Sequence, residues 1–179
     1  MNLSNTWFTS DTHYWHSNVI KYCNRPFSSV EEMNEALIDN WNAVVKDGDT
    51  VFHLGDVIFA GVTKARQIIP RLKGNKILIR GNHDSIFKKD DKWKSVGFNE
   101  VFTSLSFFSD FYKIHLGLVH NPAHPIALAM TEEWILNGHV HEKWTQRYKN
   151  INVGVDVWNF KPVHLDQIME LIDAGPRDF

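Results

Sequence analysis

Ile77-Leu78-Ile79-Arg80-Gly81-Asn82-His83-Asp84 joins a short β-type apolar run to a turn that carries an amide, an imidazole and a carboxylate. Similar apolar runs directly precede Asp11-Thr12-His13, Gly55-Asp56 and His120, and a fifth cluster is Gly138-His139-Val140-His141. Carboxylate, imidazole and amide oxygen at strand ends suit a pair of borderline divalent metals. Two such metals a few ångströms apart are a known device for attacking phosphate esters.

The order D-x-H, G-D, G-N-H-D, H, G-H-x-H resembles that of the calcineurin-like metallophosphoesterase superfamily over positions 9–141. Five clusters in this order are far more specific than any one of them. Further stretches resemble a small prokaryotic and phage-type subgroup: 11–20, 25–27, 53–56 and 152–158. The resemblance implies one metallophosphoesterase domain over residues 1–179, folded as a four-layer α/β/β/α sandwich with mixed sheets.

The hydrophobic patterns predict alternating strands and helices in the first half and more strands in the second. For the first half we expect strands 6–10, 50–54 and 76–80 and helices 30–45 and 63–72. For the second half we expect two or three strands within 101–119, strands 134–137 and 151–155, and a closing helix 165–174. Ser29 is the expected N-cap of the first long helix. This alternation favours a mixed sheet system with helical crossovers.

The composition is that of a single globular domain of ordinary size, with 179 residues, 43% hydrophobic and 22% charged. A formal net charge of −2 gives no global basic field, which argues against long nucleic acid as a partner. The Lys-rich stretch 88–94 carries both signs and indicates a solvated helix face. One cysteine, no signal-peptide pattern and no apolar run long enough to span a bilayer predict a cytoplasmic protein without a membrane partner.

The resemblance implies two divalent metal ions and no organic cofactor. One metal is expected on Asp11, His13, Asp56 and His141, and the other on Asp56, Asn82, His120 and His139. Such ligands suit Mn, Fe, Ni, Co or Zn. Two divalent ions against the two carboxylates leave a residual charge of about +2, which would hold a phosphate and lower the pKa of a bridging water. Gly55 is expected to allow a close backbone approach beside Asp56.

Each ligand taken alone has an ordinary structural reading. Asp11 and Asp56 at strand ends are often caps or turn formers, and His13 or His120 alone is more often a hydrogen-bonded loop residue. Unrelated caps would not fall in the family's order, so the joint pattern favours a dinuclear site.

The resemblance gives His83 a catalytic role near the leaving group, with Asp84 orienting the imidazole. The alternative is that His83 packs the loop and Asp84 caps the next helix. Many family members carry Glu at the position of Asp84. His16, Arg25 and His124 are weaker candidates for substrate binding; for Arg25, an ordinary loop arginine is the main alternative.

The sequence therefore predicts a dinuclear metal-dependent phosphoester hydrolase, with a phosphodiesterase acting on a small or nucleotide-type substrate as the favoured form. A diester carries one charge, which the metals can balance, whereas a monoester usually needs further cations. The alternatives are a catalytically weak, metal-stabilised binding scaffold, a phosphomonoesterase and a nuclease of the same superfamily. The natural substrate and the oligomeric state are not encoded in any recognisable pattern.

Overall fold

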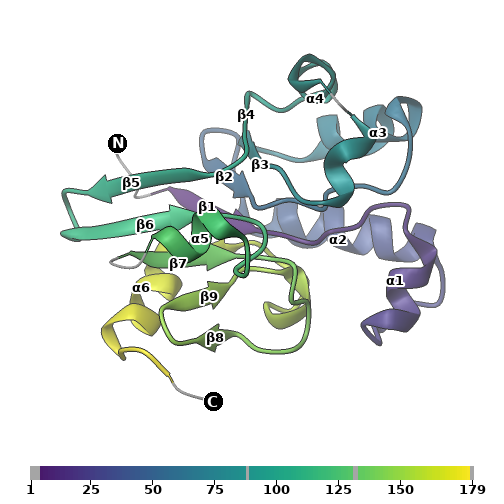
Figure 1. Cartoon of the computed structure of the whole chain (residues 1–179). Helices are drawn as coiled ribbons and strands as arrows, with labels where there is room; N and C mark the ends of the chain where they lie inside the picture. The colour runs from purple at the N-terminus through teal and green to yellow at the C-terminus, as the bar shows by residue number, and fades with distance from the viewer. Residues whose placement is uncertain (1–4, 88, 131–132, 178–179) are drawn as a thin grey trace.

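Two mixed five-stranded β-sheets face each other in the computed structural model, which describes residues 5–87, 89–130 and 133–177 (Figure 1). The first sheet has the order β10-β1-β2-β3-β4. Its first four strands in the chain run parallel, and β10 pairs antiparallel with β1 at one edge. The strand bounds are β1 (Thr6–Thr9), β2 (Thr50–His53), β3 (Asn75–Ile79), β4 (Glu100–Phe102) and β10 (Val163–His164).

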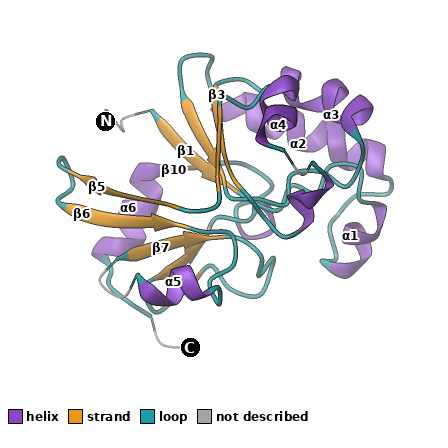
Figure 2. Cartoon of the chain, turned by 45° about the horizontal axis from the view of Figure 1, so that its top comes forward, coloured by secondary structure: helices purple, strands orange, loops and turns teal. Residues whose placement is uncertain are grey.

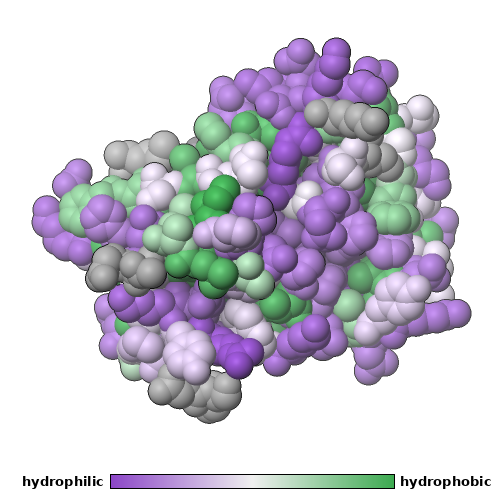
Figure 3. All heavy atoms as spheres, in the orientation of Figure 1, coloured by the Kyte–Doolittle hydropathy of each residue, from purple (hydrophilic) through white to green (hydrophobic). Residues whose placement is uncertain are grey.

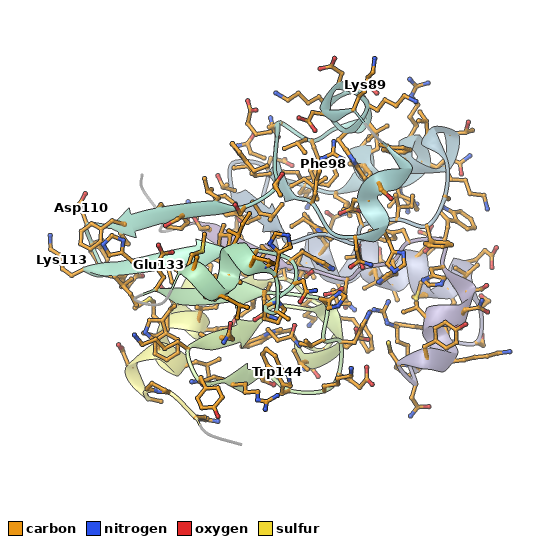
Figure 4. All side chains as sticks on the ribbon, viewed as in Figure 1. Lys89, Phe98, Asp110, Lys113, Glu133 and Trp144 are labelled. Atoms are coloured by element: carbon orange, nitrogen blue, oxygen red, sulfur yellow. The ribbon has the colours of Figure 1, made fainter. Side chains whose placement is uncertain are left out.

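The second sheet has the order β5-β6-β7-β9-β8, with parallel pairing at its centre and an antiparallel strand at each edge. The bounds are β5 (Leu105–Ser109), β6 (Ile114–Leu118), β7 (Trp134–Asn137), β8 (Gln146–Arg147) and β9 (Asn150–Asn152). The β5–β6 hairpin projects from the body, with Asp110 and Lys113 at its tip (Figure 4). The strand expected at 151–155 ends earlier, because residues Val155–Val157 form a 3-10 turn, η3.

Helices cover the outer faces of both sheets, which confirms the predicted α/β/β/α sandwich (Figure 2). Helices α2, α3 and α4 lie together against the first sheet, and α5 lies against the second. Helix α6 packs into the core between the sheets. The bounds are α1 (Ser17–Tyr22), α2 (Val30–Val44), α3 (Val62–Ile68), α4 (Asp90–Val96), α5 (Pro125–Ala129) and α6 (Leu165–Asp173). The short helices α1 and α5 were not predicted from the sequence.

Alternate residues of β2 bury their side chains in different cores. Val51 belongs to the cluster beneath α2, whereas Phe52 belongs to the cluster between the sheets. There Phe52 stacks on Phe8, with ring centroids 5.5 Å apart, and lies 6.2 Å from the ring of Phe107 in the second sheet. A strand covered on both faces is apolar along its length, which is why the β-type runs were visible in the sequence.

Helix α2 begins as the sequence predicted, because the Ser29 hydroxyl accepts a hydrogen bond from the Glu32 amide at 3.1 Å. The next expected helix, 63–72, is divided. Helix α3 ends at Ile68, and the chain continues as a 3-10 turn, η1 (Ile69–Arg71). Pro70 lies in the first positions of this turn, where its missing amide hydrogen costs no hydrogen bond.

The described part of the Lys-rich stretch lies on α4 and is largely solvated, as expected, and the surface over α4 is mostly hydrophilic (Figure 3). Lys88 lies outside the described residues. Trp93 is the exception, because it is fully buried between Phe87 and Phe98. Within the described residues, no helix combines the length and the apolar character needed to cross a membrane.

Candidate metal centre

The carboxyl ends of five strands lead into the predicted ligands. Strands β1, β2 and β3 precede Asp11, Asp56 and Asn82, and strands β6 and β7 precede His120 and His139. Three groups of possible ligands result among the described residues, and within each group the ligand atoms all lie within 4.8 Å of one another. One of them, Cys23, His141 and Asp156, shares His141 with the predicted ligands, and the other two consist of predicted ligands alone. These two groups are Asp11, His13 and His141, and Asp56, His120 and His139.

Five of the seven predicted ligands have a left-handed backbone conformation. Their φ angles are 56° at Asp11, 49° at His13, 56° at Asp56, 70° at His139 and 50° at His141. Non-glycine residues seldom adopt this conformation, which costs of the order of 1–3 kcal/mol each. Such strain persists only where the surrounding fold enforces it, and its concentration here indicates a functional site.

Two glycines allow the ligand loops to touch. Gly55 has a φ of 93°, and a Cβ there would lie 2.4 Å from the Gly81 amide nitrogen and 2.8 Å from Nδ1 of His120. A Cβ on Gly138 would lie 2.4 Å from Oδ2 of Asp11. The close approach that the sequence analysis expected at Gly55 is therefore present, and side chains at these positions would push the ligand loops apart.

Asp56 lies between the two groups. Its Oδ2 is 3.6 Å from Nε2 of His13 and 3.4 Å from Nε2 of His120, while its Oδ1 accepts the His83 amide at 2.9 Å. Burial alone would raise the pKa of Asp56, but the hydrogen bond and charge of His120, with the hydrogen bond from the His83 amide, hold it below its ordinary value. Asp56 is thus an ionised carboxylate, positioned as a bridging ligand would be.

Asn82 brings an amide oxygen to the second group. Its Oδ1 lies 3.0 Å from Nε2 of His120 and 3.0 Å from Nδ1 of His139. The Nδ1 of His120 bonds to the Leu54 carbonyl at 2.7 Å, which turns Nε2 toward the cluster. Burial disfavours the His120 imidazolium, but the hydrogen bond to Asp56 and the nearby carboxylate charges outweigh it and raise its pKa to about 9. The carboxylates around His120 therefore favour a positive charge at this position in the second group.

The first group contains two buried polar atoms that fit a metal ion. Oδ1 of Asp11 and Nε2 of His13 have no hydrogen-bond partner in the described parts of the chain. Leaving a buried polar group unsatisfied costs about 1–3 kcal/mol, and a divalent cation would satisfy both atoms. Burial raises the pKa of Asp11 and lowers that of His13, so the His13 imidazole is neutral, the form that binds metals. Nε2 of His141 lies 4.0 Å from the same Asp11 oxygen.

Arg25 does not face the site, and its predicted contact with a substrate phosphate is wrong. Its side chain is fully buried and forms a two-point ion pair with Asp156 at 2.7 and 2.9 Å. The guanidinium also donates to the carbonyls of Asp11 at 2.7 Å and Thr12 at 3.1 Å. Arg25 therefore holds the loop that carries two predicted ligands, Asp11 and His13, and has no free donor for a phosphate.

Asp84 is not placed to orient the His83 imidazole. It is fully buried, and its two carboxylate oxygens accept the amides of Gly81 at 2.7 Å, Asp56 at 2.9 Å and Val57 at 3.0 Å. Burial raises its pKa to about 6, although these hydrogen bonds favour the ionised form. Asp84 thus ties the loop after β3 to the loop after β2, for which the short arm of Asp suffices.

Two cavities flank the cluster. One, of about 440 Å³, is lined by His13, His16, His83 and His141 together with Phe59 and Lys143. The other, of about 360 Å³, is lined by Asn82, His120, His124 and His139. His83 is exposed, with its ring 5.6 Å from that of His13. His16 and His124, both weaker candidates, therefore lie beside the cluster in two different cavities.

Asp156, Cys23, Phe59 and Lys143 are among the residues of the site that were given no role from the sequence. Asp156 lies within the stretch 152–158 that carried the resemblance, and its Oδ2 is 3.1 Å from Nδ1 of His141. Burial opposes the charged form of His141, but the hydrogen bonds to Asp156 and Cys23, with the charge of Asp11, raise its pKa to about 10. Phe59 and Lys143 belong to no motif. The stretch 152–158 was the one available signal, but it neither singled out Asp156 nor showed its partner.

Comparisons with known proteins extend over nearly the whole chain. Residues 4–164 match the model of a family described as calcineurin-like phosphoesterase. An uncharacterised protein of Methanocaldococcus jannaschii is 42% identical, with 98% of this chain and 95% of that protein covered. The gene 66 protein of Mycobacterium phage L5 is 32% identical, with 96% and 95% covered. The crystal structure of an Aquifex aeolicus protein of unknown function has a TM-score of 0.72 and 26% identity, with 93% and 98% covered.

Proposed function

The chain belongs to the calcineurin-like phosphoesterase family, and from this membership we propose that it is a dinuclear metal-dependent phosphodiesterase for a small or nucleotide-type substrate. The observation that carries the proposal is the position of Asp56 between two groups of ligand atoms. Two divalent ions bound there would supply positive charge to the phosphate oxygens and lower the pKa of a water molecule.

Residues of the chain would bind the metals, donate a proton to the leaving group and hold the ligand loops together. We assign the metals to Asp11, His13, Asp56, Asn82, His120, His139 and His141. His83 is exposed beside this cluster and would give a proton to the leaving oxygen. Asp84 acts through the backbone, because its three amide contacts hold the loops of Asp56 and His83 together.

The two cavities favour a diester, whose phosphorus carries a substituent on each side. A phosphate at the cluster would adjoin both cavities, because His13 and His141 line the cavity of His16, and Asn82, His120 and His139 line that of His124. A monoester is a dianion and would need further cations, but the Arg25 guanidinium is engaged by Asp156. Arg80 lines one cavity and is paired with Asp90, which leaves Lys143, at the rim of the other, as the cation best placed to help.

A metal-stabilised scaffold without turnover remains the competing class of function, and a phosphomonoesterase or nuclease the competing enzyme. The exposed His83 favours catalysis over a scaffold, and the formal charge of −2 disfavours long nucleic acid. The identity of the metals, with manganese among the candidates, the single-domain organisation over 1–179 and the location in the cytoplasm stay predictions from the sequence.

Hydrolysis of bis(p-nitrophenyl) phosphate and of p-nitrophenyl phosphate, measured with the same metal at the same pH, tests the proposal. We expect faster turnover of the diester. A clear preference for the monoester would make the protein a phosphatase, and no turnover of either compound with any of Mn²⁺, Ni²⁺, Co²⁺ and Zn²⁺ would favour the scaffold.

A further inference from the structure

We propose that the cavity beside His83 is a subsite for a planar aromatic leaving group, which stacks against Phe59. The inference rests on the proposed function, because it takes the phosphate to lie at the cluster, and it extends that function by naming the chemistry of one substituent. An aryl ring and a nucleobase are the two sources of such a group.

Phe59 is an exposed ring on a rigid support. It is 48% exposed, and His16 stacks on it with ring centroids 4.4 Å apart and an angle of 18° between the planes. Because His16 covers one face, a ligand would meet the part of the ring that stays exposed. Aromatic rings prefer offset or edge contacts with other rings, worth about 0.5–1.5 kcal/mol beyond the area that they bury.

The backbone that carries this ring is held in place, and the ring itself packs against His16 and His83. The Phe59 amide donates to the Tyr14 carbonyl at 2.8 Å, and Tyr14 and Ile58 form an isolated parallel bridge. The side chains of both Tyr14 and Ile58 are buried. A ring that is already held in place loses little conformational freedom on binding, which increases the contribution of each contact.

The position of Phe59 relates it to the leaving group. Its ring lies 5.5 Å from that of His83, in an edge arrangement, and His83 lies 5.6 Å from His13. The Phe59 ring is therefore next to His83, the residue that we assign to protonation of the leaving group. His83 in turn is next to His13, a predicted metal ligand. A group that stacks on Phe59 would therefore be attached to the oxygen nearest His83.

The remaining walls of the cavity suit a flat group with a polar edge. Tyr22 is 72% exposed and meets His16 edge-on, with centroids 6.3 Å apart. Glu142 and Lys143 also line the cavity and are exposed, so they can meet polar substituents or solvent. A volume of about 440 Å³ is within the range of small-molecule sites. A single exposed phenylalanine is common on protein surfaces, but here the rings of Phe59, His16 and Tyr22 line one cavity at the cluster.

Binding of phosphonates to the Mn²⁺-loaded protein by calorimetry tests the inference without any turnover. Phenylphosphonate and cyclohexylphosphonate share the metal-binding group and differ in the planarity of the ring, so the ratio of their Kd values isolates aromatic stacking. We expect phenylphosphonate to bind about two- to tenfold more tightly. The Phe59→Ala variant should bring the ratio close to one, and Phe59→Trp should keep it.

Phe111→Ala is the matched control, because Phe111 is 84% exposed and follows β5 in the hairpin, away from the residues that line the cavity. It should leave the ratio unchanged. The ratio of the Kd values of adenosine monophosphate and ribose 5-phosphate, measured in the same four proteins, distinguishes a nucleobase from an aryl ring as the natural ligand. A Phe59-dependent ratio in both pairs supports a nucleobase, and in the phenylphosphonate pair alone it supports an aryl group.

A ratio near one in the unmodified protein, or a ratio that Phe59→Ala leaves intact, would overturn the inference. Either result would leave the proposed hydrolysis untouched, since the assay measures binding alone. Conversely, a protein that fails to hydrolyse diesters but keeps the Phe59-dependent ratio would contradict the proposed function and support the subsite.

Discussion

Asp156 holds His141 by the ring nitrogen that faces away from the cluster: Oδ2 of Asp156 lies 3.1 Å from Nδ1 of His141, and Nε2 of His141 points toward Asp11. The same carboxylate is paired with the buried Arg25, whose guanidinium also binds the Asp11 carbonyl. One buried ion pair therefore fixes both the ring orientation of a predicted ligand and the loop of another. Hydrogen bonds that hold a ligand side chain from the side away from the metal commonly affect the affinity for the metal.

Asp156→Asn should weaken metal binding by about 10- to 100-fold, because it removes the charge that orients His141. It should also lower the free energy of unfolding by about 3–5 kcal/mol, since Arg25 is left as an unpaired buried charge. Titration calorimetry with Mn²⁺ and urea unfolding measure the two effects.

Glu35→Gln is the control for this variant, because Glu35 forms an arginine pair with Arg71 that is about half exposed on both sides. It should cost no more than about 1 kcal/mol and leave metal affinity unchanged. Equal costs for the buried and the exposed pair would contradict the role given to Asp156.

Metal removal should destabilise the protein as well as inactivate it. Oδ1 of Asp11 and Nε2 of His13 are buried without a hydrogen-bond partner among the described residues, so a bound cation satisfies them only in the folded state. At a free metal concentration about 100 times the Kd, the expected stabilisation is about 2.7 kcal/mol. Thermal unfolding with and without a strong chelator, followed by addition of Mn²⁺, measures the shift. Full hydrolytic activity in protein verified to be metal-free would rule out the metal mechanism.

Asp56→Asn and His83→Ala should separate metal binding from proton transfer. The first variant removes the charge of the carboxylate that we propose as the bridging ligand, and it should reduce both metal content and rate. The second should keep both metals but lower kcat by roughly 10²–10⁴, the usual contribution of a general acid. Elemental analysis beside initial rates distinguishes them. Equal metal loss in the two variants would mean that His83 is a ligand or a structural residue.

His53 should make the protein less stable at acidic pH. Burial lowers the pKa of its imidazole from 6.5 to about 3 in the folded state. Between these values the unfolded chain binds a proton that the folded chain excludes, so the free energy of unfolding falls as the pH drops below about 6.5. From pH 7 to pH 5 the loss from this residue is about 2 kcal/mol.

His53→Gln keeps an acceptor and a donor for the contacts to the Gly55 amide and the Thr12 hydroxyl, and it has no titrating group. Its free energy of unfolding, measured by urea denaturation at several pH values, should not show the loss of about 2 kcal/mol between pH 7 and pH 5 that we attribute to His53. The same loss in both proteins would show that His53 does not titrate in this range.

The sequence predicted the strands that carry the site because each is a local pattern. A β-type run followed by a polar cluster can be recognised without knowledge of its neighbours, and β7 was predicted with its observed bounds, Trp134–Asn137. The N-cap of α2 was likewise predicted, because Ser29 and Glu32 are close in the chain. The two-sheet arrangement came from the family resemblance and not from periodicity.

The roles of Arg25 and Asp84 could be decided only by the tertiary structure. Arg25 and Asp156 are 131 positions apart, and either one alone resembles an ordinary exposed polar residue. The electrostatic cost of burying an arginine is met only when the fold brings its carboxylate partner to it. Asp84 follows the histidine that it was expected to orient, yet its oxygens are directed to amides of two different loops.

By itself, therefore, the sequence determined the family and which residues are candidate ligands, because strand ends and the residues beyond them are encoded locally. The tertiary structure decided which polar side chains face the site and which support it from behind, because that choice depends on burial and on partners far away in the chain. It also placed Phe59 beside His83, a contact between two loops that no pattern within either loop encodes.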